Sequence, residues 1–178
     1  MKLFTTLLLV LFGFFSSENY SEKIPWRAPD QLTWADFQGV PEGNSSYVAS
    51  TNSGLSFSYS YSERNGERIF EYTIQSNFYP KLSWYRPEAA SEYILKHEQT
   101  HFDISELHAR IFRKRMEEFN FSDNRKEEIR RIYETIETER KIMQDRYDAE
   151  SDHSKNEVGE HVWRNFVAAQ LKAYDAWR

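Results

Sequence analysis

Cysteine is absent from this chain of 178 residues. Disulfide bonds therefore contribute nothing to the stability of the fold, and catalysis through a thiolate is excluded. The absence also excludes a lipoprotein that is anchored through a lipidated N-terminal cysteine. Because cysteine usage gives no information about the redox compartment, a prediction of export has to depend on the N-terminal segment alone.

A basic stripe is also missing, as are internal repeats and low-complexity segments. The formal net charge is -5, and acidic and basic residues are interleaved between Arg110 and Arg146. Mixed charge of this kind is typical of a solvated helix face with ion pairs, so the sequence predicts no binding of nucleic acid. The length is sufficient for one domain with its own core.

The N-terminal segment differs in kind from the rest of the chain. Lys2 precedes an almost unbroken apolar run from Leu3 to Phe15, which ends at Ser16. A membrane-spanning helix needs about 20 apolar residues, so this shorter run is typical of a secretory signal peptide. We therefore predict a signal peptide at residues 1–20 and an exported domain, periplasmic or secreted, at 21–178 with no stable membrane span after cleavage. The alternative is an uncleaved N-terminal anchor.

Two segments alternate between apolar and polar residues, as half-buried strands do. Between Tyr47 and Ser62, aromatic and aliphatic side chains alternate with serines, and Arg68 to Phe78 alternates again. The dipeptide Asn65-Gly66 between them is a turn signal. These features predict an antiparallel β-hairpin.

The remainder of the chain has helical periodicity. Apolar residues recur at helix spacing from Glu88 to Phe119, from Arg125 to Asp148 and from Glu157 to Trp177. Pro87 stands where a helix start favours it, and Ser122-Asp123-Asn124 can cap the second helix. The order predicts an α+β fold in which a small antiparallel sheet is followed by three helices.

The first of these helices carries the sequence His97-Glu98-Gln99-Thr100-His101, an H-E-x-x-H motif. Residues four apart share one face of a helix, so both imidazoles can reach a single ion. Glu98 can then act as general base on a zinc-activated water. The motif therefore predicts a Zn²⁺ site with His97 and His101 as ligands.

A catalytic zinc usually has three protein ligands, and the sequence leaves the third one open. His153 is favoured, because it lies in a polar loop after the second helix, and an antiparallel helix returns that loop to the start of the motif helix. Other candidates are His161 on the last helix and three acids of the second helix, Glu127, Glu134 and Glu137.

Several neighbouring residues are candidates for supporting roles. His108 shares the face of the motif but lies about 10 Å further along the helix axis, which one ion cannot bridge. Asp103 and Asp148 can orient the imidazoles through hydrogen bonds. Tyr147 lies near His153 in the sequence and can stabilise an oxyanion with its hydroxyl. Each of these four side chains can equally be structural.

The segment from His97 to Leu107 resembles the motif helix of a bacterial family, the domain of unknown function 922 family, which is regarded as a group of secreted zinc-dependent proteases. Residues 147–154 are similar to its second motif, which reads Tyr-Asp, two residues, Thr, one residue and His-Gly. The segment Trp34-Ala35-Asp36-Phe37 resembles its N-terminal part. Ser151 replaces the usual Thr and keeps the hydroxyl, whereas Ser154 replaces the Gly and alters the backbone preference of the loop.

The resemblance covers most of the chain from about Leu32 onward. It implies a zincin-like zinc protease with His97 and His101 as ligands, Glu98 as the catalytic residue and His153 as the third ligand. The predicted activity is hydrolysis of a peptide or protein substrate. One alternative is a binding module with a closed four-ligand zinc site, and another is a metal-free interaction domain. No oligomeric state follows from the sequence.

Overall fold

A computed structural model describes residues 22–28, 30–41, 47–65 and 67–178. The predicted signal peptide lies outside these residues, as does Gly66 of the predicted turn. Within the part of the chain that the structure describes, no helix is both long enough and apolar enough to cross a membrane.

The predicted hairpin is confirmed and forms the long axis of the molecule. Strands β3 (Ser53–Arg64) and β4 (Glu67–Phe78) pair antiparallel along their whole length. The short strand β1 (Ile24–Pro25) pairs with the end of β4. Strands β2 (Ala49–Ser50) and β5 (Trp84–Tyr85) form a separate small sheet.

The first predicted strand, residues 47–62, is divided in the structure into β2 and β3. The division falls at Asn52, whose backbone turns toward the β4–β5 connection. There the amide of Asn52 donates to Ser83 Oγ, and its carbonyl accepts from the amide of Tyr79. These hydrogen bonds direct β2 away from the hairpin and toward the end of the molecule that holds the histidines.

Three long helices follow, as predicted: α1 (Glu92–Glu118), α2 (Arg125–Ser151) and α3 (Glu157–Ala173). The predicted start of the first helix at Glu88 is wrong, because residues 87–89 form a separate 3-10 turn. Helix α1 begins only after Ser91, whose hydroxyl accepts from the amide of Ile94. The third predicted helix also ends early and is followed by a 3-10 turn, η4 (Asp175–Trp177).

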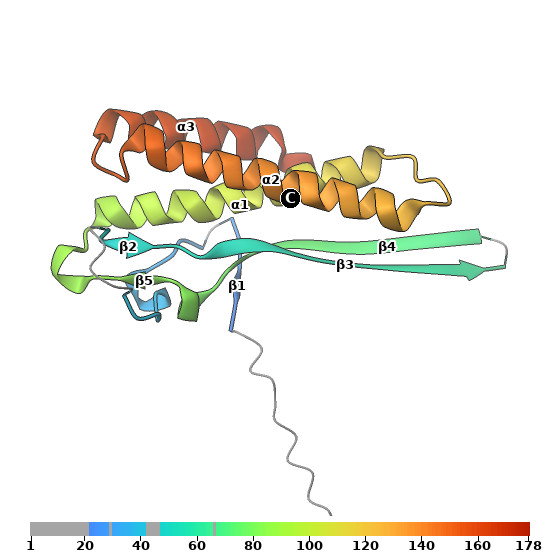
Figure 1. Cartoon of the computed structure of the whole chain (residues 1–178), viewed down its shortest axis with the longest axis horizontal. Coiled ribbons are helices and arrows are strands. Elements are labelled where there is room, and N and C mark those ends of the chain that lie inside the picture. The colour runs from blue at the N-terminus through green and yellow to red at the C-terminus, as the bar shows by residue number, and fades with distance from the viewer. Residues whose placement is uncertain (1–21, 29, 42–46, 66) are drawn as a thin grey trace, which may run out of the picture.

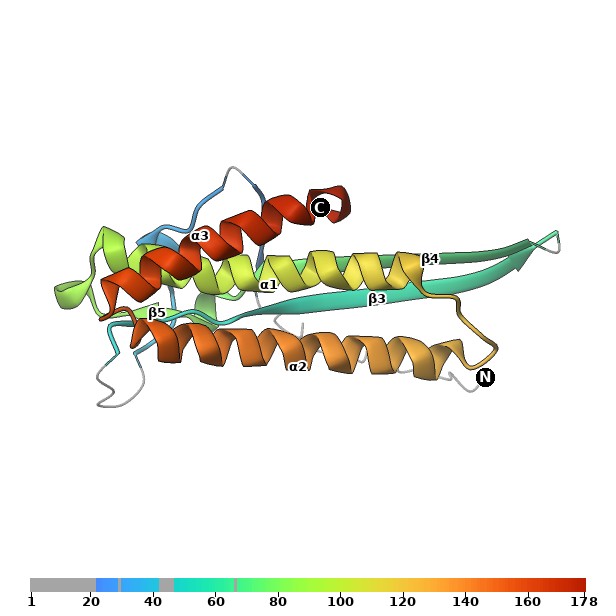
Figure 2. The same ribbon diagram turned by 90° about the horizontal axis from the view of Figure 1, so that it is seen from above.

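Helix α1 lies at the centre of the molecule. Figure 1 shows the helices stacked on one face of the β3–β4 hairpin, and Figure 2 shows α2 and α3 on either side of α1. Phe112 of α1 and Ile136 of α2 are fully buried and pack against Leu55 of β3. A second cluster, which includes Ile104 and Trp163, joins α1, α2 and α3 near the histidines. The α+β prediction is confirmed, and the zincin likeness stays a prediction.

Candidate metal centre

The two histidines of the motif converge on one point, as the helix periodicity predicts. His97 and His101 lie on the face of α1 that packs against α2 and α3, and their Nε2 atoms are 3.2 Å apart. His97 is buried, and the side chain of His101 is only 13% exposed. Two imidazole nitrogens at this separation are well placed to share an ion.

Asp148 of α2 supplies a third potential ligand atom. Its Oδ1 lies 3.4 Å from His97 Nε2 and 3.1 Å from His101 Nε2. A tetrahedral zinc with bonds of about 2.0 Å separates its ligand atoms by about 3.3 Å. The three distances between these donors therefore match the edges of a zinc tetrahedron. His97, His101 and Asp148 can hold a metal ion.

A buried carboxylate holds the far side of His97. The Nδ1 of His97 donates to Oε1 of Glu160 in α3 at 2.5 Å, and Glu160 has no exposed surface. The other carboxylate oxygen of Glu160 accepts from the hydroxyl of Tyr147 at 2.9 Å. His97 thus turns its Nε2 toward the candidate metal centre.

His101 is oriented in a similar way by an amide. Its Nδ1 donates to the side-chain oxygen of Gln144 in α2. The amide nitrogen of Gln144 donates to the backbone carbonyl of His101 at 2.8 Å, and this contact fixes which end of the amide meets the ring. In the neutral form that binds a metal, both imidazoles therefore carry their proton on Nδ1 and direct the Nε2 lone pair at the same point.

Electrostatics at this point favour a positive charge. Burial of His97 disfavours its charged form, but hydrogen bonds with Asp148 and Glu160 outweigh this effect and raise its pKa to about 9. Burial acts to raise the pKa of Asp148, but the hydrogen bonds with His101 and His97 outweigh it and hold that pKa well below its usual range. In the metal-free protein the carboxylates of Asp148 and Glu160 thus hold an additional proton on His97, and a divalent cation can take the place of this proton.

Glu98 of the motif has a carboxylate oxygen without a partner. Its side chain is 3% exposed, and its Oε2 is buried with no hydrogen bond. The backbone carbonyl of Glu98 accepts from the hydroxyl of Thr51, which fixes this part of α1 against the segment after β2. A buried carboxylate oxygen without a donor is costly, so Oε2 of Glu98 is available to accept from a donor that binds beside the histidines.

The histidines open into a cavity of about 1000 Å³. One wall consists of residues 47–51, which include β2, and the opposite wall consists of α1 and α2. The α2–α3 connection closes one side with His153, Ser154 and Lys155. The candidate metal centre is therefore accessible from a cleft that has an extended strand along it.

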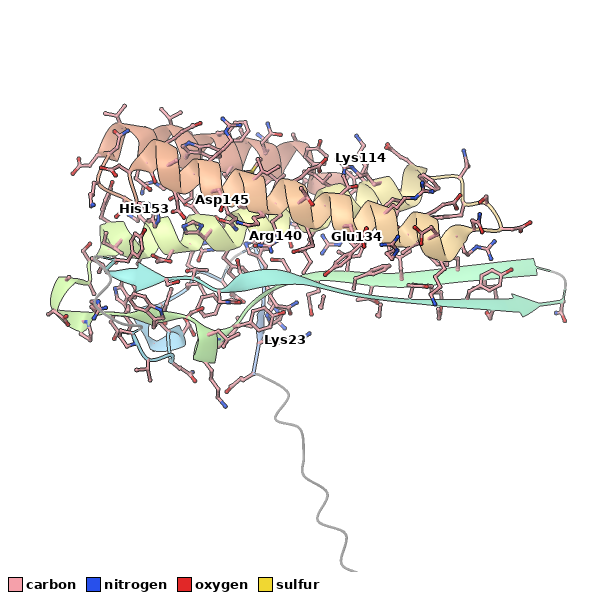
Figure 3. All side chains as sticks on the ribbon, in the orientation of Figure 1. Lys23, Lys114, Glu134, Arg140, Asp145 and His153 are labelled. Carbon is pink, nitrogen blue, oxygen red and sulfur yellow. The ribbon has the colours of Figure 1, made fainter. Side chains whose placement is uncertain are left out.

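His153 lines this cavity but lies outside the three-donor cluster. Its Nδ1 is 3.6 Å from Asp148 Oδ1, its side chain is 39% exposed, and its ring packs against that of Tyr47. Figure 3 shows His153 at the end of α2. Asp152, His153 and Ser154 all have positive φ values, between 47° and 71°, in a run of left-handed backbone that turns this loop back over α1. The predicted role of His153 as third ligand stays a prediction.

Tyr147 lies behind the histidines and does not line the cavity. It is fully buried, its ring stacks on that of His97, and its hydroxyl donates to Glu160. Burial, together with the nearby charge of Glu160, raises its pKa, so the hydroxyl stays a neutral donor. A contact between this hydroxyl and a reacting oxyanion stays a prediction. Its acceptors in the structure are Glu160 Oε2 at 2.9 Å and, at 3.4 Å, the backbone carbonyl of His97.

The other candidates for the third ligand lie apart from the cluster. Glu127 and Glu134 both pair with Arg130, and Glu137 pairs with Arg140. Figure 3 shows Glu134 far along α2 from His153. His161 is exposed on α3 and does not line the cavity.

Two candidates for supporting roles have structural partners instead. The Nδ1 of His108 donates to the backbone carbonyl of Ile104 at 2.8 Å, one helical turn away from the motif. Asp103 accepts from the indole of Trp26 and from the amide of Gln99, both at 2.8 Å. The bond from Trp26 holds the N-terminal segment on α1, and the other two lie within α1. Each of the three bonds is made to a group other than the imidazoles of the motif.

Sequence reasoning assigned Asp148 an orienting role and missed Gln144 and Glu160. Gln144, Asp148 and Ser151 recur at helix spacing, and each lies on the side of α2 that faces α1 or α3. Polar residues in that stripe of an otherwise amphipathic helix were an available signal for the site. No comparable signal marked Glu160, which is one acid among many.

Comparison of the chain with curated proteins finds no match, and neither does comparison with solved structures. One family profile matches residues 28–154, a range that includes the H-E-x-x-H motif, Asp148 and His153 and ends before α3. Its description is "Bacterial protein of unknown function (DUF922)". The match covers more than half of the chain and agrees with the resemblance of the two motifs. The chain therefore belongs to the DUF922 family.

Proposed function

We propose that this protein is an exported zinc-dependent metallopeptidase. The observation that carries the proposal is the position of Glu98, whose unpartnered Oε2 is buried on the helix that also bears two of the three potential metal ligands. A site that served only to hold a metal has no need of a further carboxylate at this position. The apolar run from Leu3 to Phe15 supports export.

The donor set fits zinc. Two imidazoles and one carboxylate form a common set of ligands in catalytic zinc sites, and they leave a fourth position for water. The imidazoles favour a transition metal over Mg²⁺ or Ca²⁺, which prefer oxygen ligands. The separations of 3.1 to 3.4 Å between the three donor atoms suit the small radius of zinc.

The residues of the chain divide the chemistry between them. Zinc, when bound, supplies an activated water and a Lewis acid for a peptide carbonyl. Glu98 would accept the proton of the attacking water on its carboxylate and deliver it to the leaving amine. His97, His101 and Asp148 would hold the metal, while Gln144 and Glu160 keep the two rings in place.

The cavity supports a peptide as the substrate. Strand β2 pairs with β5 through Ala49 and Ser50, and it lines the cavity along its length. An extended peptide could run beside this strand and present its backbone carbonyls to the metal centre. Lys155 also lines the cavity, and its charge would favour an acidic group on that peptide.

Metal content and peptide hydrolysis test the proposal together. We expect about one zinc per chain in the full-length wild type by elemental analysis, as catalytic sites of this kind bind. We expect zinc to remain in Glu98→Gln while hydrolysis of a quenched fluorescent peptide library falls by at least about 100-fold, as for loss of an essential acid–base group. Wild type that holds no zinc after zinc is added back would refute the proposal.

A second candidate function is a binding module with a structural zinc. It is favoured by the distance of 3.6 Å between His153 and Asp148, which places a fourth donor beside the cluster. A site closed by His153 would have no position for water. Stoichiometric zinc without hydrolysis of any peptide, in wild type and in His153→Ala, would favour this module over the peptidase.

A further inference from the structure

Helix α3 contributes a buried carboxylate to the metal centre although it supplies none of the three ligand atoms. Glu160 has no exposed surface, yet both of its carboxylate oxygens have partners. Oε1 accepts from His97 Nδ1 at 2.5 Å, and Oε2 accepts from the Tyr147 hydroxyl at 2.9 Å, with Arg164 3.9 Å away. Burial of a carboxylate is costly unless its oxygens are hydrogen-bonded. Both oxygens of Glu160 accept from a donor, so this cost is offset.

These contacts leave His97 little freedom. One face of its ring stacks on Tyr147, with centroids 4.7 Å apart and an interplanar angle of 27°. Its Nδ1 is held by Glu160, so Nε2 is the nitrogen that faces Asp148 and the cavity. An imidazole that donates from Nδ1 to a carboxylate has its tautomer fixed and is a more basic metal ligand through Nε2.

The two histidines are held by acceptors of different charge. His101 donates to the neutral amide of Gln144, which lies on α2, whereas His97 donates to a carboxylate. His97 also lies deeper than His101 in the protein. The orientation of His97 therefore depends on α3 in a way that the orientation of His101 does not.

We propose that Glu160 is a positioning residue of the metal centre, which orients His97, fixes its Nδ1–H tautomer and makes α3 necessary for full metal affinity. This inference rests on the proposed function in one respect, that His97 is a metal ligand. It assigns a role to a helix that lies beyond the residues matched by the family, 28–154. Asn156 and Gly159 at the start of α3 serve the same end, because the cap that they form sets the helix on α2.

Zinc affinity of Glu160→Gln tests the proposal. The amide is nearly isosteric with the carboxylate and can still accept from Nδ1, but it carries no charge. In the full-length protein we expect the zinc dissociation constant, measured by competition with a chromophoric chelator, to rise by about 10- to 100-fold, as for other partners of metal-ligating histidines. Glu157→Gln is the matched control, since Glu157 is exposed on the same helix three residues earlier, and its affinity should equal that of wild type.

Two further measurements separate orientation of His97 from general support of the fold. Tyr147→Phe keeps the ring that stacks on His97 but removes the donor to Glu160, and we expect a smaller loss of zinc affinity. The visible absorption of the Co²⁺-loaded protein should shift in Glu160→Gln and stay unchanged in Glu157→Gln, because it reports on the geometry of the ligands. Circular dichroism of each metal-free variant establishes that it is folded.

The outcomes are distinguishable from those of the proposed function. If wild type binds zinc and Glu160→Gln binds it as tightly as Glu157→Gln, with an unchanged Co²⁺ spectrum, Glu160 is not a positioning residue, and the metal centre stands without it. If folded wild type binds neither zinc nor Co²⁺, the proposed function fails, and this inference fails with it.

Discussion

Asp148 and His153 compete for one role at the scale of single residues. Oδ1 of Asp148 lies within 3.4 Å of both imidazole Nε2 atoms, whereas His153 contacts the cluster only through Asp148. We therefore expect Asp148→Asn, which changes a ligand, to weaken zinc binding by more than about 100-fold. His153→Ala removes only a partner of that ligand, and we expect it to weaken zinc binding by about 10-fold or less. Chelator competition measures both, and the reverse order would make His153 the third ligand.

The raised pKa of His97 gives the metal-free protein a defined dependence on pH. The folded pKa is about 9 and the unfolded value about 6.5, so between these values the native state binds the additional proton. This contribution to stability is complete below about pH 6.5 and is lost as the pH rises through 9, with a slope of at most about 1.4 kcal/mol per pH unit. Urea denaturation in the presence of a chelator measures it.

His97→Gln is the matched variant for this pH series, because it removes the titrating group. We expect the fall in the free energy of unfolding between pH 6.5 and 9 to be absent from this variant. An equal fall in the variant and in wild type would mean that another group titrates in this range.

At the scale of elements, α3 approaches α2 closely at Gly159. A Cβ atom added at this position would lie 2.5 Å from the backbone oxygen of Glu150 and 2.7 Å from Nδ2 of Asn156. Gly→Ala within a helix usually stabilises by about 1 kcal/mol. Here we expect Gly159→Ala to destabilise the protein by about 1–2 kcal/mol. The atom that the new methyl group meets belongs to the backbone of α2, so the clash is relieved only if α3 moves away from α2.

Denaturant unfolding measures directly whether Gly159→Ala lowers or raises the free energy of unfolding. Val158→Ala is the control, since Val158 is adjacent, 75% exposed and free of this crowding. We also expect Gly159→Ala to weaken zinc binding, because Glu160 follows directly. A stabilised Gly159→Ala would show that the first turn of α3 can shift away from α2 at no cost.

Elements with a strong period could be predicted, and their relative placement could not. The alternation in Ser53–Arg64 and the H-E-x-x-H spacing in α1 are local properties, so β3, β4 and the pair His97 and His101 follow from the sequence. Asp148 reaches that pair only because the cluster around Ile136 sets the register of α2 against α1. Side-chain packing decides this register, and no local pattern encodes it.

Helix ends show the same limit on a smaller scale. The Ser122-Asp123-Asn124 segment was predicted to cap α2, yet Asn124 makes no side-chain cap at that helix. Instead the backbone amide and the hydroxyl of Ser122 both bond to the carboxylate of Glu128. The sequence names the residues that can cap a helix, and the approach of the preceding chain decides how they are used.

At the scale of the whole molecule, the candidate metal centre joins all three long helices. His97 and His101 come from α1 and Asp148 from α2, and Glu160 supports His97 from α3. An ion that binds only the folded state stabilises it by about 2.7 kcal/mol when its free concentration is 100 times the dissociation constant. Zinc should therefore raise the thermal midpoint of the entire protein in one transition and not that of a single segment.

Differential scanning calorimetry with and without a chelator tests this coupling. We expect zinc to raise the midpoint of wild type by several degrees, as about 2–3 kcal/mol does in a protein of this size, and to leave Asp148→Asn almost unchanged. His161→Ala is the matched control, since His161 is exposed on α3 and lies outside the cavity, and it should respond to zinc as wild type does. An unaltered midpoint in wild type at saturating zinc would mean that the folded protein binds zinc no more tightly than the unfolded chain does. The three helices would then share no zinc site, and the buried Oε2 of Glu98 would be left unpaired for another reason.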